Sequence, residues 1–249
     1  MPDTRKHRGP HPDDHRRFAP DRWPVLRRAV ADLSWLLTRG YSDNASLKLV
    51  GDRYRLDQRQ RIAVHRCSCS DQALADRLAR ECPAGQIRGA ELVLDGFNVL
   101  TTIEAALAGG ILLWGRDRCL RDLAGMHGTY RKVHETIPAL QAIGRSLHEH
   151  LGAAKLRWCL DRPVSNSLRL ATLMRQVAAE HHWPWEVEVL DAVDPLLRES
   201  SQIVCTSDAG ILDLCGRWFA ATREVVKHCT PQATVVYLEC ERYDEENSV

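Results

Sequence analysis

The sequence ELVLDGFN, which runs from Glu91 to Asn98, gives the clearest indication of the fold. Three of its first four residues are apolar, and an aspartate, a glycine and an asparagine follow within the next four positions. A short apolar run that ends in turn residues is typical of a buried strand followed by a helix. We expect Asn98 to orient Asp95 by a hydrogen bond, to cap the helix that begins near Val99, or to do both.

Further apolar runs of strand length follow this one. They occupy residues 111–114, 156–160, 186–190, 203–206 and 234–238. Helical patterns lie between them, such as the face shared by Leu140, Ile143, Leu147 and Leu151. Because strands alternate with helices, the sequence predicts an α/β domain over residues 86–249, with a mostly parallel sheet covered on both faces.

The preceding residues show a different, helical pattern. An apolar stripe at helical spacing lies between Leu26 and Leu37. Shorter helices are expected at about 43–50, 58–66 and 71–82. We therefore expect a small all-helical domain over residues 21–85. Residues 1–20 contain four prolines, and this composition predicts a flexible lead-in.

Charge also divides the chain. Residues 1–66 contain 15 lysines and arginines against eight acidic residues, whereas the remaining 183 residues carry a net charge of −6. The basic part suits an anionic partner, with nucleic acid favoured, although a solvated arginine-rich surface is an alternative. The candidate nucleic-acid contacts are Arg53, Arg55, Arg59 and Arg61. The acidic remainder suits a site that gathers carboxylates around a cation.

Composition excludes several classes of protein. The chain has 249 residues, of which 44% are hydrophobic and 27% charged, as in ordinary globular proteins. It contains no uninterrupted apolar run near the ~18 residues that a membrane helix needs, so no membrane partner is expected. Its first residues lack the apolar segment of a secretory signal, and its nine cysteines are scattered. We therefore expect a cytoplasmic protein with reduced thiols.

Three of the predicted strands are followed by an aspartate, directly or within two residues. These are Asp95, Asp161 and Asp208. Because the carboxyl ends of parallel strands lie at one edge of a sheet, we expect the three carboxylates to meet there. They repel one another, and a hard divalent cation such as Mg²⁺ or Mn²⁺ relieves that repulsion. Such a metal can activate water and neutralise charge on a phosphodiester, which is nuclease chemistry.

Other residues complete the predicted site. Asp213, one helical turn beyond Asp208, is a fourth candidate metal ligand. A mid-chain acid is also expected, and the sequence does not choose among Glu104, Asp117 and Asp122, which we place on or near helices. The candidate phosphate contacts are Ser165, Asn166, Ser167 and Ser207. Taken one at a time, most of these residues could simply form a turn or cap a helix. Three aspartates at three strand ends together favour a metal site.

Two strings within this pattern resemble the PIN/NYN-like nuclease superfamily. They are LVLDGFNV at 92–99 and TSDAGILD at 206–213. The resemblance implies a three-layer α/β/α fold and a metal-dependent ribonuclease. It makes Asp95 and Asp208 metal ligands and gives Asn98 the role of supporting Asp95. Asp161, on a central strand, fits NYN-like members of the superfamily.

The whole chain also resembles an uncharacterised prokaryotic family in which a small helical domain of unknown function precedes a PIN-like domain. The strings that carry this resemblance are RGYSDN at 39–44, LVGDRY at 49–54 and DRPVSNS at 161–167. It covers about residues 22–240, and the superfamily resemblance implies RNA as the partner.

Two other functions remain open on the sequence alone. One is a catalytically degenerate PIN-like protein that binds nucleic acid or regulates without cleaving. The other is a phosphohydrolase or phosphotransferase with a strand-end aspartate as nucleophile, although Gly96-Phe97 stands where such enzymes have a second aspartate. A homodimer is also left open.

Overall fold

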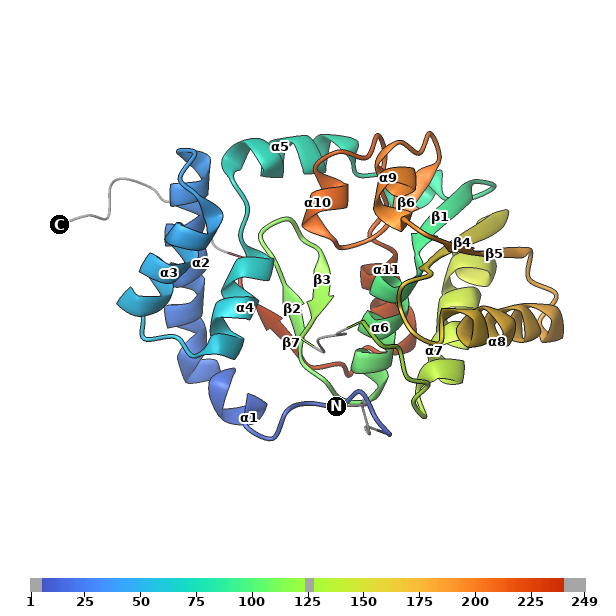
Figure 1. Ribbon diagram of the computed structural model, residues 1–249, viewed down its shortest axis with the longest axis horizontal. Coiled ribbons are helices and arrows are strands. Elements are labelled where there is room, and N and C mark those ends of the chain that lie inside the picture. Colours follow the sequence, from blue (N-terminus) through green and yellow to red (C-terminus); the bar gives the residue numbers. More distant parts are fainter. Residues whose placement is uncertain (1–5, 124–127, 240–249) are drawn as a thin grey trace.

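Two β-sheets organise the computed structural model, which describes residues 6–123 and 128–239 (Figure 1). The larger sheet has four parallel strands in the order β5-β4-β1-β6. These strands are β1 Glu91–Asp95, β4 Lys155–Asp161, β5 Trp185–Leu190 and β6 Ile203–Cys205. The smaller sheet has the order β3-β2-β7. Its strands are β2 Leu112–Trp114, β3 Leu120–Asp122 and β7 Val235–Tyr237.

The α/β class and the parallel sheet predicted from the sequence are confirmed, but the strands do not form one sheet. β2 and β7 pair with each other in parallel, and β3 adds an antiparallel strand that the sequence pattern did not indicate. In the larger sheet β1 is central, since Leu94 lies opposite Trp158 of β4 on one side and Cys205 of β6 on the other. The ends of β4, β1 and β6 therefore lie next to one another.

Helices cover both faces of the larger sheet, an arrangement compatible with three α/β/α layers (Figure 1). The helices of one face are α6 Gly96–Leu107, α7 Thr136–Gly144, η3 Arg145–His150, α8 Ser167–Glu180 and α11 Ala221–Cys229. Leu92 and Leu94 point into this layer, whereas Val93 packs with the opposite one. The opposite layer contains α9 Val193–Arg198 and α10 Ala209–Leu212. This alternation is the two-residue period of a strand buried on both faces.

The helical N-terminal region packs on the smaller sheet. Its helices are α1 Asp14–Arg17, η1 Pro20–Arg22, α2 Trp23–Thr38, α3 Asp43–Arg53, α4 Gln58–Cys67 and α5 Asp71–Arg80, and η2 Ala84–Gln86 follows. The predicted stripe of α2 is buried, and it shares one core with Leu113 of β2 and Val236 of β7. The helical region and the smaller sheet therefore stabilise each other. No helix among the described residues is both long enough and apolar enough to cross a membrane.

Residues 6–20, which lie within the predicted lead-in of residues 1–20, contact the rest of the chain through several buried side chains. Arg8, Asp14 and Phe18 are buried. The Arg8 guanidinium lies 2.5 Å from the Glu104 carboxylate, and Arg59 pairs with Asp14 at the same distance. Partners 96 and 45 residues away anchor this segment, so its own composition did not reveal the contacts.

Candidate functional site

The three strand-end aspartates lie along one edge of the larger sheet. Asp95 is the last residue of β1, Asp161 is the last residue of β4, and Asp208 lies three residues beyond β6. Since β1 lies between β4 and β6, Asp95 is the middle one of the three. The negative charges of both Asp208 and Asp161 contribute to raising the pKa of Asp95, so both carboxylates lie within electrostatic reach of it.

Asp95 is held in a nearly closed environment. It is 9% exposed, and its Oδ2 accepts a hydrogen bond of 2.8 Å from the Thr206 hydroxyl. Its Oδ1 accepts the backbone N–H of Asn98 and so caps α6. Burial is the main cause that raises the pKa of Asp95 to about 7, and the Asp208 charge adds to it. The carboxyl group therefore takes up or releases a proton near neutral pH.

Asn98 locks the loop that carries Asp208. Its side-chain oxygen accepts hydrogen bonds from both the backbone N–H and the hydroxyl of Ser207, at 2.8 and 3.0 Å. The expectation that Asn98 caps a helix beginning near Val99 is wrong, because Asn98 lies inside α6, which begins at Gly96 and is capped by Asp95. The bond to Asp95 comes from the backbone N–H of Asn98, and its side chain instead fixes the loop after β6. Asp208 itself caps α10 by accepting the N–H of Ile211 at 3.2 Å.

Asp161 stands at the side of this pair. Burial raises its pKa, the backbone N–H of Val193 opposes that rise, and the charge of Asp194 adds to it. It therefore faces the start of α9. Within residues 6–123 and 128–239, no three His, Cys, Asp or Glu side chains lie close enough together to hold a metal ion. The candidate site therefore centres on Asp95, with Asp208 and Asp161 within electrostatic reach of it.

The three candidate mid-chain acids lie in three different environments. Glu104 is fully buried in α6, where it accepts hydrogen bonds from Arg8, Tyr130 and Thr136. Burial raises the pKa of this carboxyl, and the Arg8 charge counteracts the rise. Its partners come from the N-terminal segment and from residues 130–136, and none of the three is a strand-end residue.

Asp117 and Asp122 do not lie on a helix, which corrects the expectation from their spacing. Asp117 lies in the turn between β2 and β3, and Asp122 ends β3. Asp122 Oδ2 accepts a hydrogen bond of 2.9 Å from Thr102, which follows Asn98 by one turn of α6. Asp122 is therefore bonded to α6 one helical turn after Asn98.

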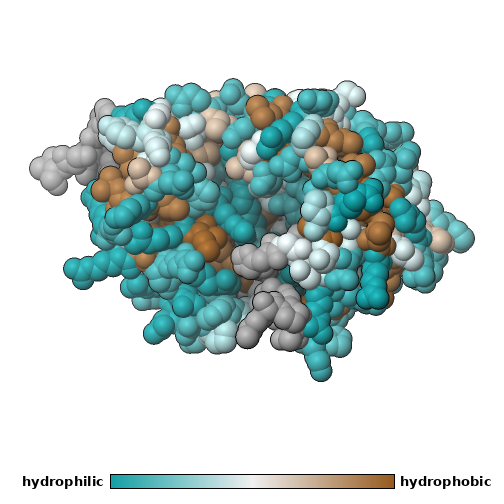
Figure 2. Space-filling view, viewed as in Figure 1, coloured by the Kyte–Doolittle hydropathy of each residue, from teal (hydrophilic) through white to brown (hydrophobic). Residues whose placement is uncertain are grey.

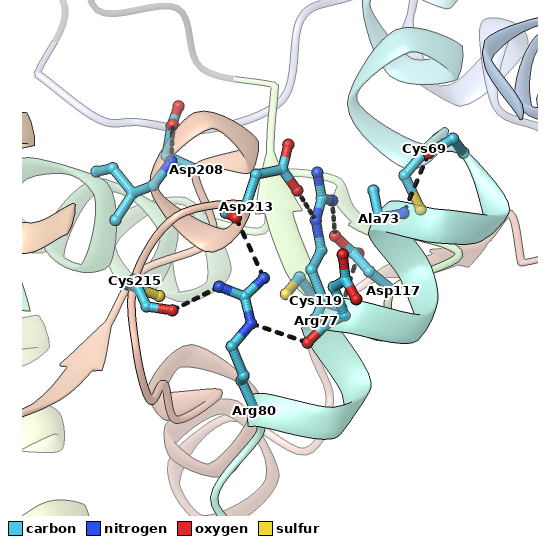
Figure 3. Close-up of polar contacts among 12 residues, drawn as sticks. Cys69, Ala73, Arg77, Arg80, Asp117, Cys119, Asp208, Asp213 and Cys215 are labelled. Carbon is cyan, nitrogen blue, oxygen red and sulfur yellow. Dashed lines mark hydrogen bonds and ion pairs between the residues drawn. The ribbon is translucent and has the colours of Figure 1, made fainter. Parts of the chain in front are cut away.

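Asp117 belongs to a buried network of charges behind the site (Figure 3). Both of its oxygens accept hydrogen bonds from Arg121, and one also accepts from Arg77 at 2.6 Å. Burial alone would raise the pKa of Asp117, but the charges of Arg121 and Arg77 hold it well below its usual range. Arg121 Nε also donates to the carbonyl of Ser207 at 2.8 Å, so the network supports the loop after β6.

Asp213, a candidate metal ligand, takes part in the same network. Its carboxylate accepts a hydrogen bond of 2.7 Å from Arg77 Nε, and Figure 3 shows it pointing toward that arginine of α5. Arg80 bonds to the backbone of Asp213 and Cys215. Helix α5 of the N-terminal region thus braces the segment that begins at Asp208.

The candidate phosphate contacts fall into two groups. Ser165, Asn166 and Ser167 precede or begin α8, and Asn166 adopts a left-handed conformation with φ of 70° and donates to the carbonyl of Tyr130. Ser167 is buried, whereas Ser165 and Asn166 are exposed. Ser207 is 3% exposed, and its hydroxyl is engaged by Asn98.

Two of the four candidate nucleic-acid arginines are engaged in close ion pairs within the protein, and two are exposed. Arg59 holds Asp14 through two nitrogens, and Arg61 pairs with Asp52 at 2.7 Å. Arg53 lies 3.3 Å from Asp32 but remains 68% exposed. Arg55 is exposed and adopts a left-handed backbone conformation.

Sequence reasoning missed Thr206 and Arg121 as parts of the site. Thr206 had a signal, because a hydroxyl residue between a strand and its aspartate is placed to bond at the sheet edge. Arg121 had none, since its contact with Ser207 joins residues 86 positions apart. Figure 2 shows the middle of one face of the molecule hollowed and lined mainly by hydrophilic residues, between the N-terminal helices and the larger sheet.

Comparison with known proteins shows similarity to two described families and one relative. A profile described as a domain of unknown function (DUF5616) matches residues 84–224, and one described as a protein of unknown function (DUF434) matches residues 25–80. An uncharacterised protein of Methanocaldococcus jannaschii is 26% identical over 187 residues, which cover 75% of this chain and 88% of the relative. No solved structure matches the chain.

Proposed function

The chain belongs to the DUF5616 family, and we propose from its strand-end site that it is a PIN/NYN-like, metal-dependent nuclease that cleaves RNA. The observation that carries the proposal is the environment of Asp95. A buried carboxyl at the end of the central strand has its pKa raised to about 7, and a second carboxylate, Asp208, follows the neighbouring strand. Such a shift at a sheet edge is typical of functional sites.

A hard divalent cation fits the donors at this edge. Mg²⁺ commonly binds one or two carboxylates, several waters and the substrate's phosphates, and so needs no cage of three protein ligands. Asp95 and Asp208 are the proposed ligands, with Asp161 and Asp122 as the acids that complete the surroundings. When bound, the cation activates water and neutralises charge on the phosphodiester.

The chain's own residues prepare this edge before any ligand arrives. Thr206 and the N–H of Asn98 fix the orientation of Asp95, so little reorganisation is needed on binding. Burial of Asp95 strengthens its attraction to a cation, because few water molecules screen the charge. The bonds from Ser207 to Asn98 hold the loop of Asp208 against the helix that follows β1.

A second candidate function is RNA binding without cleavage. It is favoured by the engagement of Asp117 and Asp213 with Arg77, which leaves these acids as structural ion pairs. In this alternative the edge holds too few carboxylates for catalysis, and the fold is retained for binding. The two functions differ in one observable, since only the nuclease releases shortened RNA.

Incubation of the purified chain with end-labelled single-stranded RNA tests the choice. We expect cleavage with Mn²⁺ or Mg²⁺, none with EDTA, and losses of at least about 100-fold in Asp95→Asn and Asp208→Asn, in line with the rate that positioned electrostatic groups contribute. Asp191→Asn is the matched control, because Asp191 directly follows β5 at the same edge, is exposed and pairs with Arg162. Cleavage of equal rate in all four proteins would overturn the assignment. RNA binding without cleavage under either metal would favour the alternative.

A further inference from the structure

A basic groove lies beside the start of α8. Two adjoining pockets of about 400 and 360 Å³ share Arg131 and Lys132 as lining residues. Arg169 and Asn166 line the first, and Lys6 lines the second. We call the surface formed by these five residues the basic groove.

Positive charge is concentrated in the basic groove. Lys6, Arg131, Lys132 and Arg169 are all exposed, and no Asp or Glu is among the described residues that line either pocket. Two nearby acidic residues have partners of their own. Glu104 bonds to Arg8, and the carboxylate of Glu135 lies 2.6 Å from the His7 ring nitrogen. Arg131, Lys132 and Arg169 belong to residues 67–249, whose net charge is −6. A cluster of positive side chains is therefore unusual for this part of the chain.

The groove adjoins the carboxyl edge of the larger sheet. Asn166 of the groove follows Asp161, the end of β4, by only five positions. The Tyr130 ring lies 5.5 Å from the ring of Phe97, which follows Asp95 by two residues. A parallel backbone bridge between Thr129 and Ser165 joins the two walls. A chain lying in the groove therefore approaches the edge that carries the candidate site.

We propose that the basic groove binds the phosphodiester backbone of single-stranded RNA and leads it to Asp95 and Asp208. This inference rests on the proposed nuclease function and names the surface that holds its substrate. Exposed lysines and arginines bind successive phosphates without reading sequence. The groove takes the place of Arg59 and Arg61 as the main contact, since these two arginines pair with acids of the protein.

Binding in EDTA, where cleavage is absent, tests the groove separately from the chemistry. The probe is a fluorescein-labelled oligouridylate of about 20 nucleotides, followed by anisotropy from roughly 50 to 200 mM salt. Lys132→Glu combined with Arg169→Glu should weaken binding about tenfold or more. The slope of log affinity against log salt should fall by about 1.4, because each single-strand phosphate contact contributes about 0.7.

The control variant reverses two charges outside the groove. Arg145→Glu with Arg217→Glu changes the net charge equally, and these exposed arginines lie at the start of η3 and beside Gln86. Its binding should stay close to that of the unmodified chain. Lys132→Gln with Arg169→Gln should give an intermediate loss, and thermal unfolding of each variant shows whether it is folded.

Equal losses in the groove variant and the control would overturn the proposal, as would unchanged binding in the folded groove variants. An unmodified chain that binds the probe through the groove but never cleaves RNA supports the groove and contradicts the nuclease assignment. Cleavage that proceeds at an unchanged rate in the folded groove variants supports the nuclease assignment and contradicts the groove.

Discussion

The Thr206 hydroxyl donates a hydrogen bond of 2.8 Å to Oδ2 of Asp95, and the oxygen of that hydroxyl accepts the backbone N–H of Asp208 at 3.0 Å. A single side chain therefore orients the carboxylate of Asp95 and fixes the backbone from which the Asp208 side chain extends. It also joins the end of β6 to the end of β1, the two strands from which those carboxylates come. Removal of this hydroxyl should therefore alter the surroundings of both Asp95 and Asp208.

Thr206→Val tests that link, because valine keeps the shape and removes the hydroxyl. The lost hydrogen bond is one that lowers the pKa of Asp95, so in the variant this pKa should rise above about 7. Calorimetric titration with Mn²⁺ should then show weaker binding at neutral pH and recovery as the pH is raised. Thr206→Ser retains the hydroxyl and should restore binding. Superimposable pH curves for the valine and serine variants would contradict the positioning role.

The raised pKa of Asp95 also predicts a pH-dependent effect on stability. A carboxyl whose pKa is about 7 in the folded chain and about 4 when unfolded destabilises the fold increasingly from pH 4 to pH 7, and fully above that range. In EDTA, Asp95→Asn should therefore increase the free energy of unfolding at pH 8, by up to about 4 kcal/mol, and change it little near pH 4. Urea unfolding at the two pH values measures the difference. A gain that is the same at both would show that charge is not its cause.

The buried network behind the site should be costly to break at one point. Asp117→Asn leaves Arg77 and Arg121 without the carboxylate that both of them hold, and we expect a loss of about 3–5 kcal/mol in the free energy of unfolding. Asp117→Leu combined with Arg121→Met removes a buried pair together and should recover part of that loss. If the single variant unfolds at the same urea concentration as the unmodified chain, the network contributes no stability.

Gly96 follows Asp95 at a point where the chain has no room for a side chain. A Cβ there would lie 2.5 Å from the Leu160 side chain and 2.7 Å from the carbonyl oxygen of Cys159. Gly96→Ala should therefore push α6 away from β4, destabilise the fold by about 1–3 kcal/mol and reduce RNA cleavage. Gly85→Ala is the control, because nothing lies within 4 Å of its added Cβ. Thermal unfolding and cleavage rates of the two variants give the comparison.

Local patterns in the sequence predicted the strands and most helices well. The stripe of α2 and the six apolar runs form the expected elements, because burial repeats with the period of each. The aspartates at the strand ends also lie at one sheet edge, since parallel strands end together. These inferences needed only information within a few residues.

Contacts between distant residues were not predictable in this way. The strands at 112–114 and 235–237 pair with each other across more than a hundred residues, so nothing local separated them from the larger sheet. Asp117 and Arg121 have the spacing of a helical ion pair, yet Arg118 turns the chain in a left-handed conformation and β3 follows. The local sequence around Arg8 indicates a solvated segment, whereas in the structure Arg8 is buried and paired with Glu104.

The proposed function requires that Asp95 and Asp208 hold one divalent cation between them. The decisive measurement uses a crystal of the full chain soaked in Mn²⁺, with data collected at a wavelength where manganese scatters anomalously. We predict an anomalous peak about 2 Å from a carboxylate oxygen of each residue, and its absence from crystals of Asp95→Asn. A crystal in which manganese binds elsewhere, with no peak at these two carboxylates at pH 8, would contradict the account.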